Sequence, residues 1–110
     1  MKYLLLIFIL ITLNANEDIL NANYERGFEY YMKTGEDKKA NTLKAIEYFE
    51  KACDEQYYKG CSDIGLIYYY GLGLKRNDIK AKAYFAKACI GKYPQGCIYY
   101  KKIDTENKTH

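Results

Sequence analysis

The chain has 110 residues, enough for one small domain, and its charge is nearly balanced, with 17 Lys and Arg against 14 Asp and Glu. Basic and acidic residues are interspersed, so the sequence lacks the clustered basic face that is typical of nucleic-acid-binding proteins. We therefore expect no nucleic-acid partner.

The first 15 residues predict a secretory signal peptide. Lys2 supplies a positive charge, residues 3–13 form an unbroken apolar run, and small and polar residues follow at 14–16. The run is too short to span a bilayer, which needs about 20 apolar residues. We expect cleavage after Ala15 and export to the periplasm or the medium, with no stable membrane anchor after cleavage. An uncleaved membrane anchor is the alternative interpretation.

An internal repeat predicts the fold of the remaining chain. Residues 45–61 align without a gap with residues 81–97, and nine of the seventeen positions are identical at an offset of 36. A second similarity, between residues 27–31 and 65–69, lies upstream at an offset of 38. Repeats of this length are typical of stacked helical units, so the sequence predicts an all-α chain of helix–turn–helix repeats.

Five helices are expected in chain order. The first repeat supplies helices over 17–33 and 42–54, the second over 58–70 and 78–90, and a capping helix covers 95–103. The helical repeat domain is then 16–103, followed by a polar tail at 104–110. Asn41 and Asn77 each precede a repeated alanine by four residues, where a side-chain oxygen can cap the first helical N–H groups.

The second helix of each repeat carries one stripe that is expected to be buried. Its members recur at i, i+4 and i+7, as Ala45, Phe49 and Ala52 and then as Ala81, Phe85 and Ala88. Gly27 and Gly65 recur in the first helices, although glycine inside a helix costs about 1 kcal/mol relative to alanine. Their recurrence predicts a close approach between the two helices of each repeat.

The four cysteines all lie in the part of the chain that would be exported: Cys53, Cys61, Cys89 and Cys97. An even number in a short exported chain indicates a disulfide framework rather than free thiols. A metal site is the alternative. Its usual C-x(2–4)-C spacing is missing, and His110, at the tail, is the only histidine. We expect no metal and no cofactor.

Residues 60–89 carry the motif G-x-x-x-x-G-L-I-Y-Y-Y-G-L-G-L-x-x-N-x-x-x-A-x-x-Y-F-x-K-A-C. This motif resembles the Sel-like repeat family, relatives of the tetratricopeptide repeats with units of about 36 residues. The resemblance implies a short right-handed solenoid. Seven residues separate Cys53 from Cys61 and Cys89 from Cys97, a spacing similar to that of the cysteine-rich, exported Hcp branch of the family. The similarity covers residues 24–100.

The branch implies further properties of this chain. Each of its disulfides joins the end of a second helix to the following first helix, which implies the pairs Cys53–Cys61 and Cys89–Cys97. It also implies a secreted or periplasmic protein of a Gram-negative bacterium. Members are labelled β-lactamases or penicillin-binding proteins, which implies weak β-lactam hydrolysis, at a site in the groove between first helices.

The motifs of serine β-lactamases test that label. Those enzymes use S-x-x-K with S-D-N and K-T-G, whereas the exported part has one serine, Ser62, with Gly65 three positions further on. The tripeptide at 33–35 spells K-T-G but fits the end of a helix that enters a turn, and no serine or cysteine has a neighbouring histidine. The catalytic residues are thus unknown, efficient catalysis is not expected, and weak β-lactam hydrolysis remains the alternative function.

Tyrosine is abundant, with 14 residues in the chain, several of them adjacent in sequence. Adjacent helical side chains point about 100° apart, so they cannot all be buried in one stripe. Some are expected to pack between repeats and others to line the concave surface that helical solenoids use for partners. The candidate binding surface comprises Tyr30, Tyr31, Tyr68, Tyr69 and Tyr100. The predicted function is an exported adaptor that binds a peptide, a protein or a peptidoglycan fragment of the cell wall.

Overall fold

The computed structural model describes residues 2–6, 21–33, 35 and 37–108, and these residues form helices and turns without a strand. The predicted cleavage after Ala15 lies outside the described residues. No helix in the described part of the chain is both long and apolar enough to cross a membrane. After a short helical segment at residues 2–6, five helices follow: α2 (Ala22–Met32), α3 (Lys38–Asp54), α4 (Tyr58–Tyr70), α5 (Asp78–Ile90) and α6 (Pro94–Lys108).

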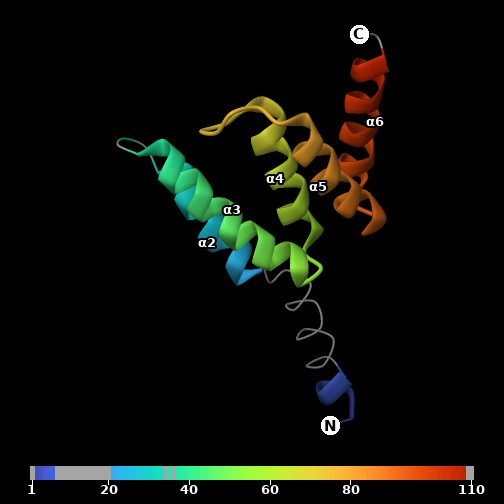
Figure 1. The fold of residues 1–110 in the computed structure, drawn as a ribbon. Coiled ribbons are helices and arrows are strands. Elements are labelled where there is room, and N and C mark those ends of the chain that lie inside the picture. The colour runs from blue at the N-terminus through green and yellow to red at the C-terminus, as the bar shows by residue number, and fades with distance from the viewer. Residues whose placement is uncertain (1, 7–20, 34, 36, 109–110) are drawn as a thin grey trace.

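Each helix packs on the one before it, which confirms the predicted all-α repeat architecture. Helices α2 and α3 form the first hairpin, α4 and α5 form the second, and α6 packs on α5 as the first half of a further unit (Figure 1). The contact between α3 and α4 joins the two hairpins. The result is a short solenoid in which α2, α4 and α6 are the first helices of successive units.

The start of α3 differs from the prediction. The helix begins at Lys38, and the side chain of Asp37 caps it by accepting a hydrogen bond of 3.3 Å from the backbone N–H of Ala40. Asn41 was predicted as the cap and instead lies in the first turn of the helix, so that prediction is wrong. Asp37 reaches the capping position because its backbone is left-handed, with φ of 64°, a conformation that aspartate tolerates better than most residues.

The start of α5 agrees with the prediction, and the end of α6 lies beyond the predicted one. The predicted cap at Asn77 is confirmed, since its side chain accepts a hydrogen bond of 3.0 Å from the backbone N–H of Lys80. Helix α6 runs to Lys108, beyond the predicted end at residue 103 and into the segment predicted as a polar tail. Glu106, in this extension, accepts a hydrogen bond from the Tyr69 hydroxyl and so ties the last turns to α4.

The core includes the predicted stripes. The alanines and phenylalanines of α3 and α5 that recur at the repeat offset are all buried: Ala45, Phe49, Ala52, Ala81, Phe85 and Ala88. Both phenylalanine rings lie against a glycine of the preceding first helix. A Cβ atom on Gly27 would lie 2.7 Å from the Phe49 ring, and one on Gly65 would lie 2.6 Å from the Phe85 ring. The predicted close approach between the helices of each repeat is therefore confirmed.

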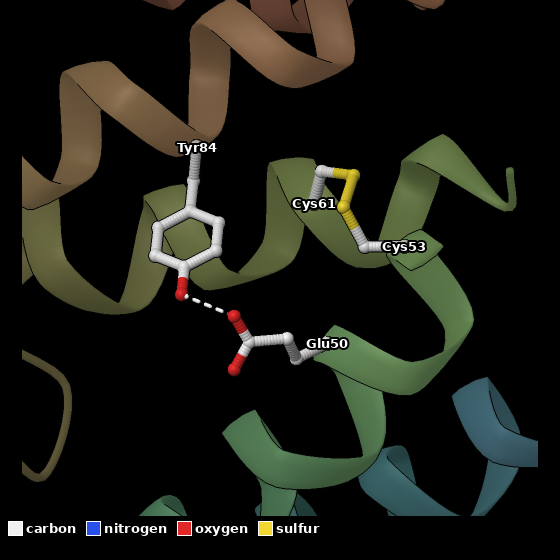
Figure 2. Close-up of a disulfide and its surroundings, with 4 residues drawn as sticks. All are labelled: Glu50, Cys53, Cys61 and Tyr84. Atoms are coloured by element: carbon white, nitrogen blue, oxygen red, sulfur yellow. Dashed lines mark hydrogen bonds between the residues drawn. A yellow bond between two sulfur atoms is a disulfide. The ribbon is translucent and has the colours of Figure 1, made fainter. Parts of the chain in front are cut away.

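Two disulfides join consecutive helices at the end opposite the α4–α5 loop. Cys53 is bonded to Cys61 between α3 and α4, and Cys89 to Cys97 between α5 and α6, with Cα–Cα distances of 5.0 and 4.5 Å. Figure 2 shows the first disulfide beside a hydrogen bond of 2.9 Å from the Tyr84 hydroxyl to the Glu50 carboxylate. Covalent closure of such short loops stabilises a fold by about 2–3 kcal/mol each in the chain-entropy model, which is substantial for so small a stack.

We expect Gly65→Ala to lower the free energy of unfolding by about 1–3 kcal/mol, because its methyl group overlaps the Phe85 ring. Urea unfolding followed by circular dichroism measures the change. The double variant with Phe85→Leu is the control: if the ring causes the clash, the alanine costs less in the leucine background. Equal cost in both backgrounds would contradict this packing explanation.

Candidate functional site

A groove between α2 and α4, the first helices of the two repeats, is the candidate binding site. Its cavity has a volume of about 310 Å³. Six of the side chains that line it come from positions i, i+4 and i+7 of the two helices, which face one direction on a helical surface. They are Tyr24, Phe28 and Tyr31 on α2, and Lys59, Asp63 and Leu66 on α4.

The wall of this α2–α4 groove is mostly apolar. Phe28 is 46% exposed, with its ring stacked at 6.4 Å from the ring of the buried Tyr24. Tyr31 and Leu66 are half-buried and continue the same surface. Large apolar side chains that remain in contact with water gain free energy when a ligand covers them. The groove therefore has the surface that an apolar side chain of a ligand would bury.

The floor of the groove carries a carboxylate. The Tyr24 hydroxyl donates a hydrogen bond of 2.6 Å to Oδ2 of Asp63. Burial raises the pKa of Asp63, while this hydrogen bond and the charge of Lys59 act in the opposite direction. Burial, and then the bond to Asp63, raise the pKa of Tyr24, so its hydroxyl keeps its proton at neutral pH. The pair is a polar anchor that also links the two repeats.

Tyr69 was predicted to line the binding surface, and the structure corrects this. The side chain is only 4% exposed and packs in the core beside Phe85. Its hydroxyl donates to Glu106 at 2.8 Å, and burial followed by this bond raises the pKa of Tyr69 to about 12. A side chain that is buried and bonded in this way holds α4 to α6 and is not available to a partner.

The other four predicted tyrosines do not gather at one place. Tyr31 alone of them lines the groove. Tyr30 stacks on Tyr48 at 5.7 Å, and Tyr68 stacks in the equivalent way on Tyr84 at 6.2 Å. Tyr100 lies farther along the stack, with its ring 4.9 Å from the ammonium group of Lys82. All four are half-buried.

Sequence reasoning missed several groove residues, although a signal for two of them was present. Phe28 and Leu66 occupy equivalent positions in the two repeats, directly after the recurring glycines Gly27 and Gly65. Each glycine faces a phenylalanine of its own repeat, so the next residue, about 100° further round the helix, turns toward the groove. Asp63 had no comparable pattern.

Ser62, the serine that the sequence offers as a nucleophile, lies inside the fold. The hydroxyl of Ser62 is fully buried and donates to Oε1 of Gln95 at 3.3 Å. Within the K-T-G tripeptide, Thr34 lies outside the described residues. Where the structure describes the chain, no group of three or more His, Cys, Asp or Glu side chains is placed to hold a metal ion.

Comparison with known proteins gives one match. A family model described as the Sel1 repeat matches residues 20–57 and, a second time, residues 59–92. No curated protein and no solved structure matches the chain. The first match contains the α2–α3 hairpin and the second contains the α4–α5 hairpin, so each wall of the groove belongs to a different matched repeat.

We expect Asp63→Asn to change the pH dependence of stability. Because burial raises the pKa of Asp63 above its unfolded value, the native chain should lose stability relative to the variant as pH rises from about 3 through the raised value. Above that range the difference should stay constant. Urea midpoints at several pH values measure it, with Asp54→Asn at an exposed position of α3 as the matched control. A difference that is independent of pH would contradict the assignment.

Proposed function

The chain belongs to the Sel1 repeat family, and from this membership we propose that it acts as an exported adaptor. Sel1 repeats are protein-interaction modules. The adaptor binds a peptide segment of a protein partner in the α2–α4 groove. The observation that carries this proposal is the exposed Phe28 ring, which lines a cavity of about 310 Å³ between the two repeats.

The composition of the groove supports a peptide ligand. Phe28, Tyr31 and Leu66 offer an apolar surface for a side chain of the ligand. Asp63 and Lys59 offer a hydrogen-bond acceptor and a donor of opposite charge for polar groups of the ligand, including backbone N–H and C=O. A mainly apolar pocket with a few polar groups that fix orientation is the usual form of a small binding site.

Export is supported by the cysteines and by the apolar start of the chain. The two disulfides belong in an oxidising compartment such as the periplasm or the extracellular medium. The apolar run at residues 3–13, with the predicted cut after Ala15, supplies the route. The spacing of the cysteines supports placement in the Hcp branch of the family, as a secreted or periplasmic protein of a Gram-negative bacterium.

We expect Phe28→Ala to weaken peptide binding about tenfold or more, because the ring supplies much of the exposed apolar surface of the groove. A peptide selected from a displayed random library on the wild-type protein serves as ligand, and fluorescence anisotropy gives its Kd. Ile98→Ala is the matched control, since Ile98 is 64% exposed on α6 and does not line the groove.

Thermal melting and circular dichroism show whether each variant keeps its fold; Phe28→Ala should cost more stability than Ile98→Ala, because the Phe28 ring also packs on Tyr24. The groove would be excluded as the site if both variants weakened peptide binding equally. It would also be excluded if Phe28→Ala left the Kd unchanged for several independently selected peptides.

The β-lactamase alternative rests on resemblance, and it has a separate test. We expect the purified chain and its Ser62→Ala variant to hydrolyse a chromogenic cephalosporin barely above the rate in buffer, because the Ser62 hydroxyl is inaccessible and directed at Gln95. Absorbance assays on protein taken through two unrelated purification columns measure both rates against buffer. Turnover well above buffer that stays with the protein through both columns would overturn the expectation, and its loss in Ser62→Ala would assign it to that hydroxyl.

A further inference from the structure

A second hollow lies at the opposite end of the hairpins from the disulfides. Its volume is about 800 Å³, and it is formed where α3 begins, where the α4–α5 loop passes and where α5 begins. Figure 1 shows this loop extending beyond the helices toward the start of α3. We call it the loop-end cleft and define it by Lys39, Leu43, Tyr68, Lys75, Ile79 and Lys80.

The cleft concentrates positive charge. Arg76, which also lines it, is paired with two carboxylates, Asp78 at 2.8 Å and Glu106 at 3.7 Å. Lys39, Lys75 and Lys80 make no ion pair with another described residue. The three lysines therefore leave a net positive charge at the cleft. Folding places Lys39 of α3 at the same hollow as Lys75 and Lys80, which are already close together in the sequence.

The same cleft exposes aliphatic side chains that the core does not use. Ile79 is 84% exposed and Leu43 is 48% exposed. The half-buried ring of Tyr68 lies beside them, with the ammonium group of Lys80 5.3 Å from its centroid. This mixture of lysines and aliphatic groups is complementary to a ligand with both acidic and apolar parts.

The loop that forms one wall is fixed by backbone hydrogen bonds. The N–H of Asn77 donates to the carbonyl oxygen of Tyr68, and the N–H of Leu72 donates to that of Ile67, both at 2.9 Å. Gly73, with φ of 80°, packs directly against Thr42 of α3, where a side chain would not fit. A wall that is already ordered loses little conformational entropy when a ligand binds.

We propose that the loop-end cleft binds an acidic segment of a protein partner, in which apolar side chains are interspersed among carboxylate side chains. The carboxylates pair with Lys39, Lys75 and Lys80, and the apolar side chains cover Leu43 and Ile79. The exposed aliphatic groups suit a peptide better than an anionic sugar.

This site is distinct from the α2–α4 groove. Glu25 and Glu29 stand beside Phe28 at the outer side of that groove, where they repel an acidic segment. The two surfaces therefore select ligands of different charge. Binding at the cleft does not depend on the function proposed for the groove.

Fluorescence anisotropy with a labelled 12-residue peptide that repeats Glu-Leu-Asp tests the proposal. We expect saturable binding at about 20 mM salt that weakens at about 500 mM salt. The double variant Lys39→Glu and Lys80→Glu should weaken it about tenfold or more, and Ile79→Asn should weaken it as well. Lys101→Glu and Ile98→Asn on α6 are the matched controls and should bind as the wild type does.

The charge reversals keep the fold, because positions 39 and 80 lie in the first turns of α3 and α5, where the helix dipole favours a negative charge. Circular dichroism checks this. Unchanged binding by the double variant, or equal binding of a peptide that repeats Lys-Leu-Lys, would overturn the proposal. Binding to phosphatidylglycerol vesicles that the double variant weakens to the same degree would also overturn it, and would assign the cleft to a membrane surface. Self-association that the double variant abolishes would assign it to a second copy of the chain.

Discussion

The contact between a helical glycine and a buried phenylalanine ring sets the distance between the two helices of each repeat. Phe49 lies on Gly27, and Phe85 lies on Gly65, with no room for a methyl group between them. Glycine destabilises the helix, but burial of the whole ring, which only glycine allows here, offsets this cost. The same contact orients the first helix of each repeat, so that the residues after the two glycines, Phe28 and Leu66, both face the α2–α4 groove. The groove is thus a consequence of the core packing.

So small a stack also needs connections between repeats, and tyrosine hydroxyls provide them. Tyr24 donates to Asp63 between α2 and α4, and Tyr69 donates to Glu106 between α4 and α6. Tyr84 on α5 donates to a carboxylate of α3 in the same way (Figure 2). Each bond pairs a partly buried carboxylate with a donor, which lowers the cost of removing its charge from water. Several of the tyrosines therefore have a structural role, and the sequence alone did not separate this role from the predicted one at a binding surface.

How much the sequence predicts depends on how local the determining interaction is. The repeat offset predicts the hairpins and the buried stripes, because identical residues at matching positions pack in the same way. The cap at Asn77 is also determined by local sequence. The sequence does not determine the cap of α3, because Asp37 and Asn41 both carry a suitable oxygen. The left-handed backbone of Asp37 decides between them. Tyr69 was misplaced for a related reason: in a run of tyrosines, only the position of the neighbouring helices decides which ring is buried.

The two proposed surfaces share α4, and this shared helix constrains how an adaptor of this kind could work. Asp63 faces the groove and Tyr68 lines the loop-end cleft. They are five positions apart in the α-helix, a rise of about 7.5 Å along the axis. Ligands at both surfaces would therefore be held at a short, fixed separation by one rigid element, without a flexible linker. A partner that carries an apolar segment and an acidic segment close together could engage both surfaces at once, and the second contact would then form at high effective concentration.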